Sequence, residues 1–223
     1  MNTDPYSSEI LSLMQTLVKY RMSDLRGELG KIGQTTSMLH PDVLLLIYHF
    51  AKIATGNILE IGAFVGGSTI AAAMGARDSV TPKKFITVEP GGQLKKHRMA
   101  TRNIFKDLTK NLSRHGVAAH VTALNGYSFD PVVVAAVRKE YKPGDVGFFS
   151  FDADDNVRRD LDLYGDLLAD GCWVMIDDYV GSDEKAAPTR AYVDEFVATG
   201  KLVPLGYYGW STWVGRWRVA TAG

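Results

Sequence analysis

The sequence is poor in cysteine and has no excess of charge of either sign. Cys172 is the only cysteine, so no disulfide can form within the chain, and a reducing compartment suits it. It lies in the apolar run 172–176, which favours a buried structural thiol over a nucleophile. The 25 Lys and Arg residues balance 25 Asp and Glu residues. We therefore expect no nucleic-acid partner and no attraction to an anionic membrane.

The sequence also lacks a long hydrophobic run. Its longest apolar stretch, residues 43–47, is too short to cross a bilayer, and the polar residues 1–8 lack the apolar core of a signal peptide. These absences predict a cytoplasmic protein. The 223 residues suffice for one α/β domain and are few for two. We expect a single domain over 1–223, in which N-terminal helices within 1–55 cover the site of an α/β core at 56–223.

The spacing of apolar residues predicts two helices, followed by short strands that alternate with further helices. This order is typical of a parallel, doubly wound sheet. The predicted helices are 9–26, 41–54, 68–76, 93–115, 131–141 and 157–169. The predicted parallel strands are 57–61, 85–89, 120–124, 147–152 and 172–177.

The C-terminal part predicts a different end to the sheet. A helix at 188–199 ends at Gly200, and aromatic-rich strands at 202–208 and 212–219 follow with a three-residue connection. So short a connection joins antiparallel strands. We therefore predict an α/β fold with a Rossmann-like, doubly wound, seven-stranded sheet, mostly parallel and closed by a C-terminal antiparallel hairpin.

The strongest local pattern is a glycine-rich turn after the first predicted strand. Gly62 permits a tight turn close to a ligand. Gly66 and Gly67 open a helix whose free N–H groups, with the Ser68 hydroxyl, suit a ligand carboxylate. The spacing Gly-x-x-x-Gly differs from that of pyrophosphate-binding turns, which would place a glycine at Phe64. The turn therefore favours a ligand without a pyrophosphate.

Glu89 ends the second predicted strand. An acid at this point of a doubly wound sheet is well placed to bind both ribose hydroxyls of an adenosine. A solvated glutamate at a strand end is the competing interpretation. The glycine turn at the expected separation favours the ribose role.

Three acids follow the last two parallel strands. Asp152 ends one strand, and Asp177 and Asp178 end the next. Neighbouring parallel strands bring their carboxyl ends together, so these carboxylates should crowd one corner. Such a cluster suits a hard divalent ion, Mg²⁺ or Ca²⁺. Alternatively Asp154 or Asp155 caps the next helix and Asp178 is merely exposed, but this does not explain Asp177 directly behind five apolar residues.

An ordered set of motifs extends over residues 34–180. They are QTTS at 34–37, EIGAFVGGS at 60–68, Glu89, GYS at 126–128, FDAD at 151–154 and DD at 177–178. In order and spacing this set resembles the metal-dependent O-methyltransferases of the catechol and caffeoyl-coenzyme A type and their bacterial relatives in secondary metabolism. The resemblance implies a class I, S-adenosylmethionine-dependent enzyme with a small-molecule acceptor, and is consistent with a homodimer through the N-terminal helices.

The resemblance also implies roles for individual residues. Those assigned to the cofactor are Glu60, Gly62, Ala63, Ser68, Glu89, Ser128, Asp152 and Asp154. The first four would surround the methionine part of S-adenosylmethionine, Glu89 would hold the ribose and Ser128 would lie beside the adenine. The divalent cation would bind Asp152, Asp177 and Asp178.

The chain departs from the family pattern at two positions. Asp178 stands where asparagine is common, which makes the site more anionic. Asp155 stands where the catechol-type enzymes place a lysine as general base. Either Asp155 takes the proton, with Asp152 as the other catalytic residue, or the metal acidifies the hydroxyl unaided, or another residue is the base. The candidates for that last role are Tyr127, Tyr179, Lys185 and His40.

Methyl transfer to an oxygen requires a hydroxyl that is both positioned and acidified, and a metal ion can do both. We therefore predict an acceptor with two adjacent oxygens, catechol-like or a vicinal diol. Alternatives are a metal-independent small-molecule methyltransferase, a non-catalytic module that binds S-adenosylmethionine, and a nucleotide-binding oxidoreductase, which the glycine spacing and the hairpin disfavour. Hairpin aromatics could wall the acceptor pocket or simply pack in the sheet; they are Tyr207, Tyr208, Trp210, Trp213 and Trp217.

Overall fold

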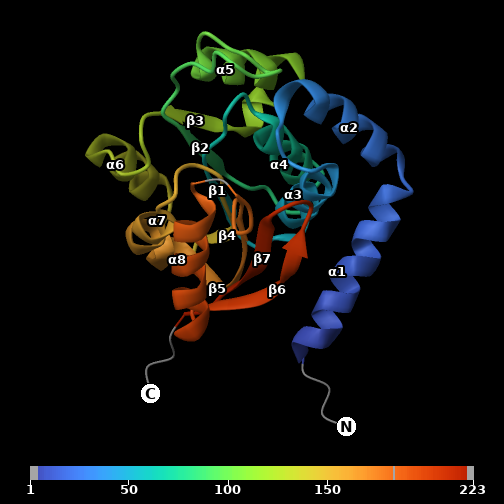
Figure 1. Cartoon of the computed structure of the whole chain (residues 1–223), viewed down its shortest axis with the longest axis vertical. Helices are drawn as coiled ribbons and strands as arrows, with labels where there is room; N and C mark the ends of the chain where they lie inside the picture. Colours follow the sequence, from blue (N-terminus) through green and yellow to red (C-terminus); the bar gives the residue numbers. More distant parts are fainter. Residues whose placement is uncertain (1–4, 183, 220–223) are drawn as a thin grey trace.

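The computed structural model describes residues 5–182 and 184–219, with three helices ahead of the sheet (Figure 1). They are α1 (Pro5–Arg21), α2 (Asp24–Thr36) and α3 (Pro41–Ile53). The single helix predicted at 9–26 is wrong. The helix is interrupted at Ser23, whose backbone is extended (φ −103°). The Ser23 hydroxyl donates to the Tyr20 carbonyl at 2.8 Å.

The second helix, α2, was missed because it contains three glycines, which oppose helix formation. Tertiary packing overrides that propensity. Leu29 and Ile32 are buried, and Gly33 lies so close to α3 that a Cβ would come within 2.8 Å of Leu44 Cδ1. The start of α3 at Pro41 is as predicted, and the His40 side chain caps it by accepting from the Asp42 N–H at 3.1 Å.

The sheet has seven strands in the order β3-β2-β1-β4-β5-β7-β6. β1 to β5 are parallel, while β7 runs antiparallel to both β5 and β6. The predicted Rossmann-like sheet with its C-terminal hairpin is therefore confirmed. The strands are β1 (Asn57–Ile61), β2 (Phe85–Glu89), β3 (Thr122–Asn125), β4 (Val146–Phe151), β5 (Leu168–Ile176), β6 (Leu202–Tyr208) and β7 (Thr212–Trp217).

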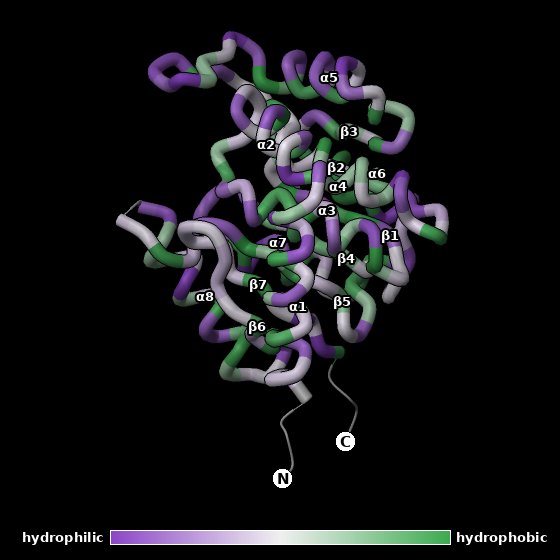
Figure 2. Tube along the Cα trace, turned by 90° about the vertical axis from the view of Figure 1, so that its right-hand side faces the viewer, coloured by the Kyte–Doolittle hydropathy of each residue, from purple (hydrophilic) through white to green (hydrophobic). Residues whose placement is uncertain are grey.

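Helices cover both faces of the sheet. Ile58 and Phe148 face a core shared with α1 to α3 and with two later helices, whereas Leu59 and Phe149 face a second core under the remaining three. This alternation gives three layers, in which the hydrophobic strands of the sheet lie between two layers of helices (Figure 2). The two later helices of the first core are α4 (Gly67–Arg77) and α5 (Ile104–Arg114). The helices over the second core are α6 (Pro131–Glu140), α7 (Val157–Tyr164) and α8 (Ala186–Ala198).

Two predicted helices are too long. Residues 93–103 are not helical but form a loop in which Leu94 and Thr101 exchange two backbone hydrogen bonds of 2.9 Å. Apolar residues are too sparse there to make a helical face, and the Asn103 side chain instead caps α5. The helix predicted at 157–169 ends at Tyr164, because Leu168 already pairs with β4.

Other boundaries shift by a few residues. A short 3₁₀ turn, Ala118–His120, precedes β3, so this strand begins later than predicted. Gly116 (φ +68°) follows His115, the C-cap residue of α5, which confirms its predicted place at the helix end. Within the described residues, no helix is both long and apolar enough to cross a membrane.

Candidate active site

The glycine turn joins the end of β1 to α4 and lies against the loop that follows β4. Gly62 has φ +91°, and a Cβ there would come within 1.9 Å of the Asp152 carbonyl oxygen. Contact between two loops therefore excludes a side chain at Gly62, which is also among the residues that line the adjoining cavity. Phe64 also has a positive φ of 48°, which is uncommon outside glycine. The turn is thus shaped by its neighbour after β4.

Glu60 lies behind this turn and is buried. Its Oε2 accepts hydrogen bonds of 2.6 Å from the hydroxyls of Thr69 and Thr87. Burial raises the pKa of Glu60, and the bonds from these hydroxyls and from Ser68 counteract that rise. Ser68 and Ala63 are buried as well. These three predicted cofactor residues support the turn from the protein side, and none lines the adjoining cavity.

Glu89, at the end of β2, is held in one orientation by backbone N–H groups. Its Oε2 accepts from Phe64 N at 2.7 Å, and its Oε1 accepts from Gly91 N at 2.8 Å. Burial raises the pKa of Glu89, while these N–H groups favour the carboxylate. Glu89 lines the cavity, and each of its oxygens retains a lone pair beyond the one used by the backbone. Such a carboxylate can accept hydrogen bonds from a diol.

Asp152, Asp177 and Asp178 come together as the sequence predicted. One carboxylate oxygen from each lies within 4.8 Å of the other two. Burial, followed by the charges of the other two acids, raises the pKa of Asp152 well above its usual value. Asp177 Oδ1 is oriented by the Thr212 hydroxyl, which donates at 2.6 Å from the start of β7. The Lys185 ammonium lies 3.9 Å from Asp178 Oδ2 and donates to the Ala153 carbonyl at 2.6 Å.

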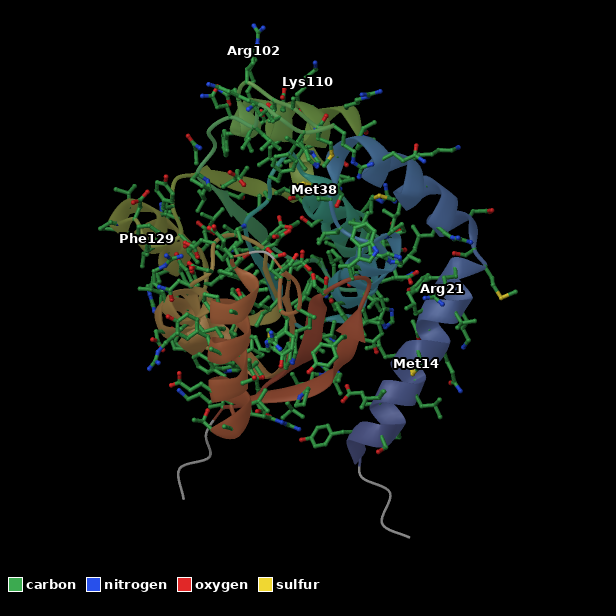
Figure 3. The ribbon with its side chains drawn as sticks, in the orientation of Figure 1. Met14, Arg21, Met38, Arg102, Lys110 and Phe129 are labelled. Carbon is green, nitrogen blue, oxygen red and sulfur yellow. The ribbon has the colours of Figure 1, made fainter. Side chains whose placement is uncertain are left out.

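A cavity of about 290 Å³ opens at the carboxyl ends of the central strands. Asp152 lies in its wall, so the acid cluster adjoins the space beside Glu89. Met38, from the segment between α2 and α3, and Phe129, from the loop after β3, also line it and are labelled in Figure 3. The full lining is Met38, Ile61, Gly62, Phe64, Val88, Glu89, Pro90, Tyr127, Ser128, Phe129, Asp152, Ala153, Asp154, Arg159 and Lys185.

The candidates for a general base lie in different places. Lys185 and Tyr127 line the cavity. The Tyr179 hydroxyl donates to Asp194 Oδ1 at 2.6 Å and is thereby directed at α8. His40 caps α3, and its ring lies 5.3 Å from that of Trp210. Asp155 is exposed and does not line the cavity.

The hairpin aromatics divide into three groups, of which one is Tyr208, half-buried against the first core. Trp213 and Trp217 are buried in the sheet, in accord with ordinary packing. Tyr207 and Trp210 are exposed, and Tyr207 stacks on Tyr179, the residue that follows Asp178, with ring centroids 5.0 Å apart. These two rings are therefore the hairpin aromatics available to a ligand.

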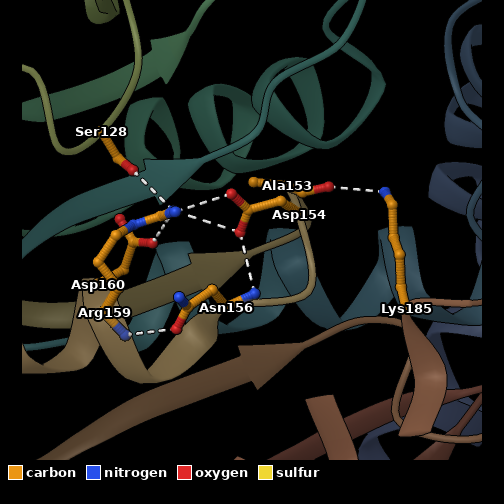
Figure 4. A network of polar contacts seen from close by, with 7 residues as sticks. All are labelled: Ser128, Ala153, Asp154, Asn156, Arg159, Asp160 and Lys185. Atoms are coloured by element: carbon orange, nitrogen blue, oxygen red, sulfur yellow. Dashed lines mark hydrogen bonds and ion pairs between the residues drawn. The ribbon is translucent and has the colours of Figure 1, made fainter. Parts of the chain in front are cut away.

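Sequence reasoning missed Arg159, which pairs with Asp154 through bonds of 2.9 and 3.2 Å and lines the cavity (Figure 4). The first turns of α7 contain two arginines and two acids, a pattern that is common on solvated helix faces. The sequence therefore gives no signal that distinguishes Arg159. The structure also corrects the capping alternative. Asn156, rather than Asp154 or Asp155, caps α7 by accepting from Arg159 N at 3.1 Å.

The solved structures that are similar to this chain include three that cover most of its length. An O-methyltransferase from Bacillus cereus in complex with SAH is 17% identical, with 98% of this chain and 93% of that chain covered and a TM-score of 0.56. A putative O-methyltransferase from Klebsiella pneumoniae is 19% identical, with 99% and 92% covered and a TM-score of 0.57. The O-methyltransferase TomG from Streptomyces achromogenes, involved in tomaymycin synthesis and solved with SAM, is 14% identical, with 89% and 91% covered and a TM-score of 0.60. At these identities the likeness shows the fold.

No curated protein sequence matches the chain. The profile of a methyltransferase domain family, however, matches residues 59–179, which is more than half of the chain. The match begins in β1 and ends just after Asp178, so it includes the glycine turn, Glu89 and the acid cluster. The sequence-based assignment to the methyltransferases is confirmed: the chain belongs to the methyltransferase domain family.

Proposed function

We propose that the protein transfers a methyl group from S-adenosylmethionine to a hydroxyl of a small molecule with two adjacent oxygens, catechol-like or a vicinal diol, with the help of a divalent cation. The observation that carries this proposal is the three-carboxylate cluster, which adjoins through Asp152 a cavity that is also lined by an oriented glutamate. Structures similar in fold include O-methyltransferases with SAH or SAM bound.

The cavity is suited to the adenosine part of S-adenosylmethionine. Glu89, fixed by two backbone N–H groups, presents acceptors for the ribose hydroxyls. Ile61, Val88 and Phe129 supply apolar surface for a planar base. When bound, S-adenosylmethionine supplies an electrophilic methyl group on its sulfonium.

The acid cluster is suited to Mg²⁺ or Ca²⁺. All three donors are carboxylates, the ligands that hard divalent ions prefer, and their mutual repulsion is relieved by a cation. Asp152, Asp177 and Asp178 would hold the ion, which supplies positive charge that lowers the pKa of an acceptor hydroxyl. Thr212 keeps Asp177 in place for this role.

Among the candidates for the base, Lys185 forms an ion pair with the cluster, and we infer that it faces the acceptor in place of Asp155, as a cation rather than as a base. Its ammonium is held by the Ala153 carbonyl beside Asp178. A positive charge there stabilises the oxygen anion that attacks the methyl group. The same ammonium supports a second candidate function, a methyltransferase without a metal. Because its charge neutralises part of the acid cluster, the cluster needs a cation less.

We also propose that residues 1–223 act as one methyltransferase domain whose N-terminal helices cover the site. Met38 supports this, since it contributes to the cavity wall from the segment between α2 and α3. Ser37 also supports this arrangement. It packs so closely on Gly67 that a Cβ added to Gly67 would lie 2.4 Å from the Cβ of Ser37.

Calorimetric titration with S-adenosylmethionine and S-adenosylhomocysteine, each in Mg²⁺ and in EDTA, tests the proposal. We expect micromolar binding that responds to the metal, and methylation of a catechol but not of a phenol. Asp177→Asn should abolish the metal response, whereas Asp162→Asn, an exposed acid on α7, should leave it unchanged. Activity that persists in EDTA would select the metal-independent candidate. Absence of binding to wild type would refute both.

A further inference from the structure

Arg159 joins three separate segments at one end of the cavity (Figure 4). Its Nη1 and Nη2 donate to Asp154 Oδ2 and Oδ1, in the loop after β4, at 2.9 and 3.2 Å. Nη2 also donates to Asp160 Oδ2 within α7 at 2.7 Å and to Ser128 Oγ in the loop after β3 at 3.5 Å. One guanidinium therefore fixes the relative positions of two loops that line the cavity.

The two acids bound by Arg159 differ in exposure. The Asp160 side chain is 0% exposed, whereas the Asp154 side chain is 46% exposed. Asp160 thus holds the guanidinium from the protein interior, and Asp154 presents its carboxylate to the cavity. Asp154 Oδ1 also accepts from Asn156 N at 3.0 Å. These contacts use three of the roughly four lone pairs of the carboxylate, which leaves one on Oδ2 for a donor in the cavity.

Aromatic and apolar side chains adjoin this acceptor. The guanidinium carbon of Arg159 lies 4.2 Å from the centroid of the Phe129 ring, and the Tyr127 ring stacks on Phe129 at 5.3 Å. Phe129 is 41% exposed, and Pro90 lines the cavity nearby. A planar ring with a hydrogen-bond donor on its edge matches this end of the cavity.

Stability of the fold does not account for the arrangement. Arg159 Nε and Asp160 Oδ1 are buried, and neither has a hydrogen-bond partner among the described residues. A buried ion pair with unsatisfied atoms is often no more stable than apolar side chains of similar size. The arrangement does, however, give Asp154 a single orientation.

We propose that Arg159 is a positioning residue that sets the base specificity of the nucleoside site, by holding Asp154 to accept a hydrogen bond from the exocyclic amino group of adenine. The inference rests on the proposed function, because it takes the cavity to hold the adenosine of S-adenosylmethionine. Adenine carries an amino donor at the position where hypoxanthine carries a carbonyl acceptor, and a fixed carboxylate discriminates between them.

The test compares dissociation constants for S-adenosylhomocysteine and S-inosylhomocysteine, measured by calorimetry on the full-length protein. Wild type should bind the adenine compound about 10- to 100-fold more tightly, the range expected for one hydrogen bond to a charged group. Arg159→Leu alone would leave Asp160 as an unpaired buried charge and could unfold the protein. The informative variant is Arg159→Leu with Asp160→Leu, which removes both charges and retains apolar volume.

The double variant should bind the two compounds within about 3-fold of each other, through weaker binding of S-adenosylhomocysteine alone, with its thermal unfolding midpoint near that of wild type. Its KM for S-adenosylmethionine should rise by a similar factor while kcat changes little, since Arg159 acts at the base. The matched control is Arg158→Leu, which removes an exposed arginine from the same turn of α7, where it pairs with Glu195 of α8; this variant should keep the wild-type ratio.

The inference fails if wild type does not discriminate, or if the folded double variant keeps the wild-type ratio. Either result, with tight S-adenosylhomocysteine binding, would leave the proposed function intact. Binding of neither compound to wild type would overturn the proposed function and the inference with it.

Discussion

The Asp152 N–H donates to the Ile61 carbonyl at 2.9 Å, one residue before the glycine turn begins. This bond extends the β1–β4 ladder to the point where both strands end, and it places the first acid of the cluster directly against the turn. The cofactor side and the metal side of the proposed site therefore share a single backbone contact. We therefore expect a distortion of either loop to change both the cofactor side and the metal side of the proposed site.

Gly62→Ala tests that shared contact. The new Cβ would meet the Asp152 carbonyl oxygen at 1.9 Å in a backbone with φ +91°, so the loops must separate. We expect a loss of more than about 3 kcal/mol in unfolding free energy, from strain and displaced packing together. Gly116→Ala has a similar φ of +68° with no atom near its Cβ and should cost only about 1 kcal/mol. Equal losses in urea denaturation of the two variants would contradict this reading.

Lys185→Met should lower kcat/KM by about 10- to 1,000-fold, because it removes the positive charge beside the acceptor oxygen. Asp155→Asn, at an exposed position outside the cavity lining, should change kcat/KM by less than about 3-fold. Initial rates of methyl transfer measure both. A severe loss in Asp155→Asn with normal rates in Lys185→Met would restore Asp155 as the base.

Thr212→Val should weaken binding of the divalent cation by about 10- to 100-fold, because Asp177 loses the hydroxyl that orients it. Ser211→Ala is the matched control, since the Ser211 hydroxyl lies farther from Asp177 Oδ1, at 3.4 Å, and should matter less. Titration with Mn²⁺ gives both affinities. Wild-type affinity in Thr212→Val would argue against a metal at Asp177.

His49, on α3, provides a test of stability against pH. Burial, with a smaller effect from Lys52, lowers the pKa of His49 from 6.5 to about 4, and its Nδ1 lies 3.2 Å from the Tyr20 hydroxyl on α1. Below pH 6.5 His49 is therefore protonated in the unfolded chain, whereas in the folded protein it is protonated only near pH 4.

Stability should accordingly fall as pH drops from 6.5 towards 4, by roughly 2 kcal/mol from this residue alone once its partial exposure is allowed for. His49→Gln should flatten the fall in that interval, as measured by urea denaturation at a series of pH values. An unchanged slope would mean that carboxylates alone determine the acid sensitivity.

The fold could be predicted largely from the sequence because its strands are short apolar runs with clear ends. Asp152 and Asp177 could be brought together from the same information, since parallel strands align their carboxyl ends. α2 could not be predicted, because its three glycines oppose a helix that tertiary contacts, among them those with α3, stabilise. Nor could the loop at 93–103, whose form depends on the pairing of Leu94 with Thr101.

The site was predictable where function depends on residues at strand ends and not where it depends on contacts between loops. Glu89 and the acids belong to the first class. Arg159 belongs to the second: its role depends on Ser128 and Asp154, which two different loops bring to α7. Lys185 reaches the cluster in the same way, from the segment before α8.

The strand order has a consequence for synthesis of the chain on the ribosome. β1 is made first, yet it lies between β2 and β4, and β5 receives its second neighbour only when β7 has been made. Parallel pairings so distant in sequence form slowly and late. We therefore expect the nascent chain to remain sensitive to protease until β7 has emerged, with the pairing of Ile176 and Trp213, next to the acid cluster, among the last steps.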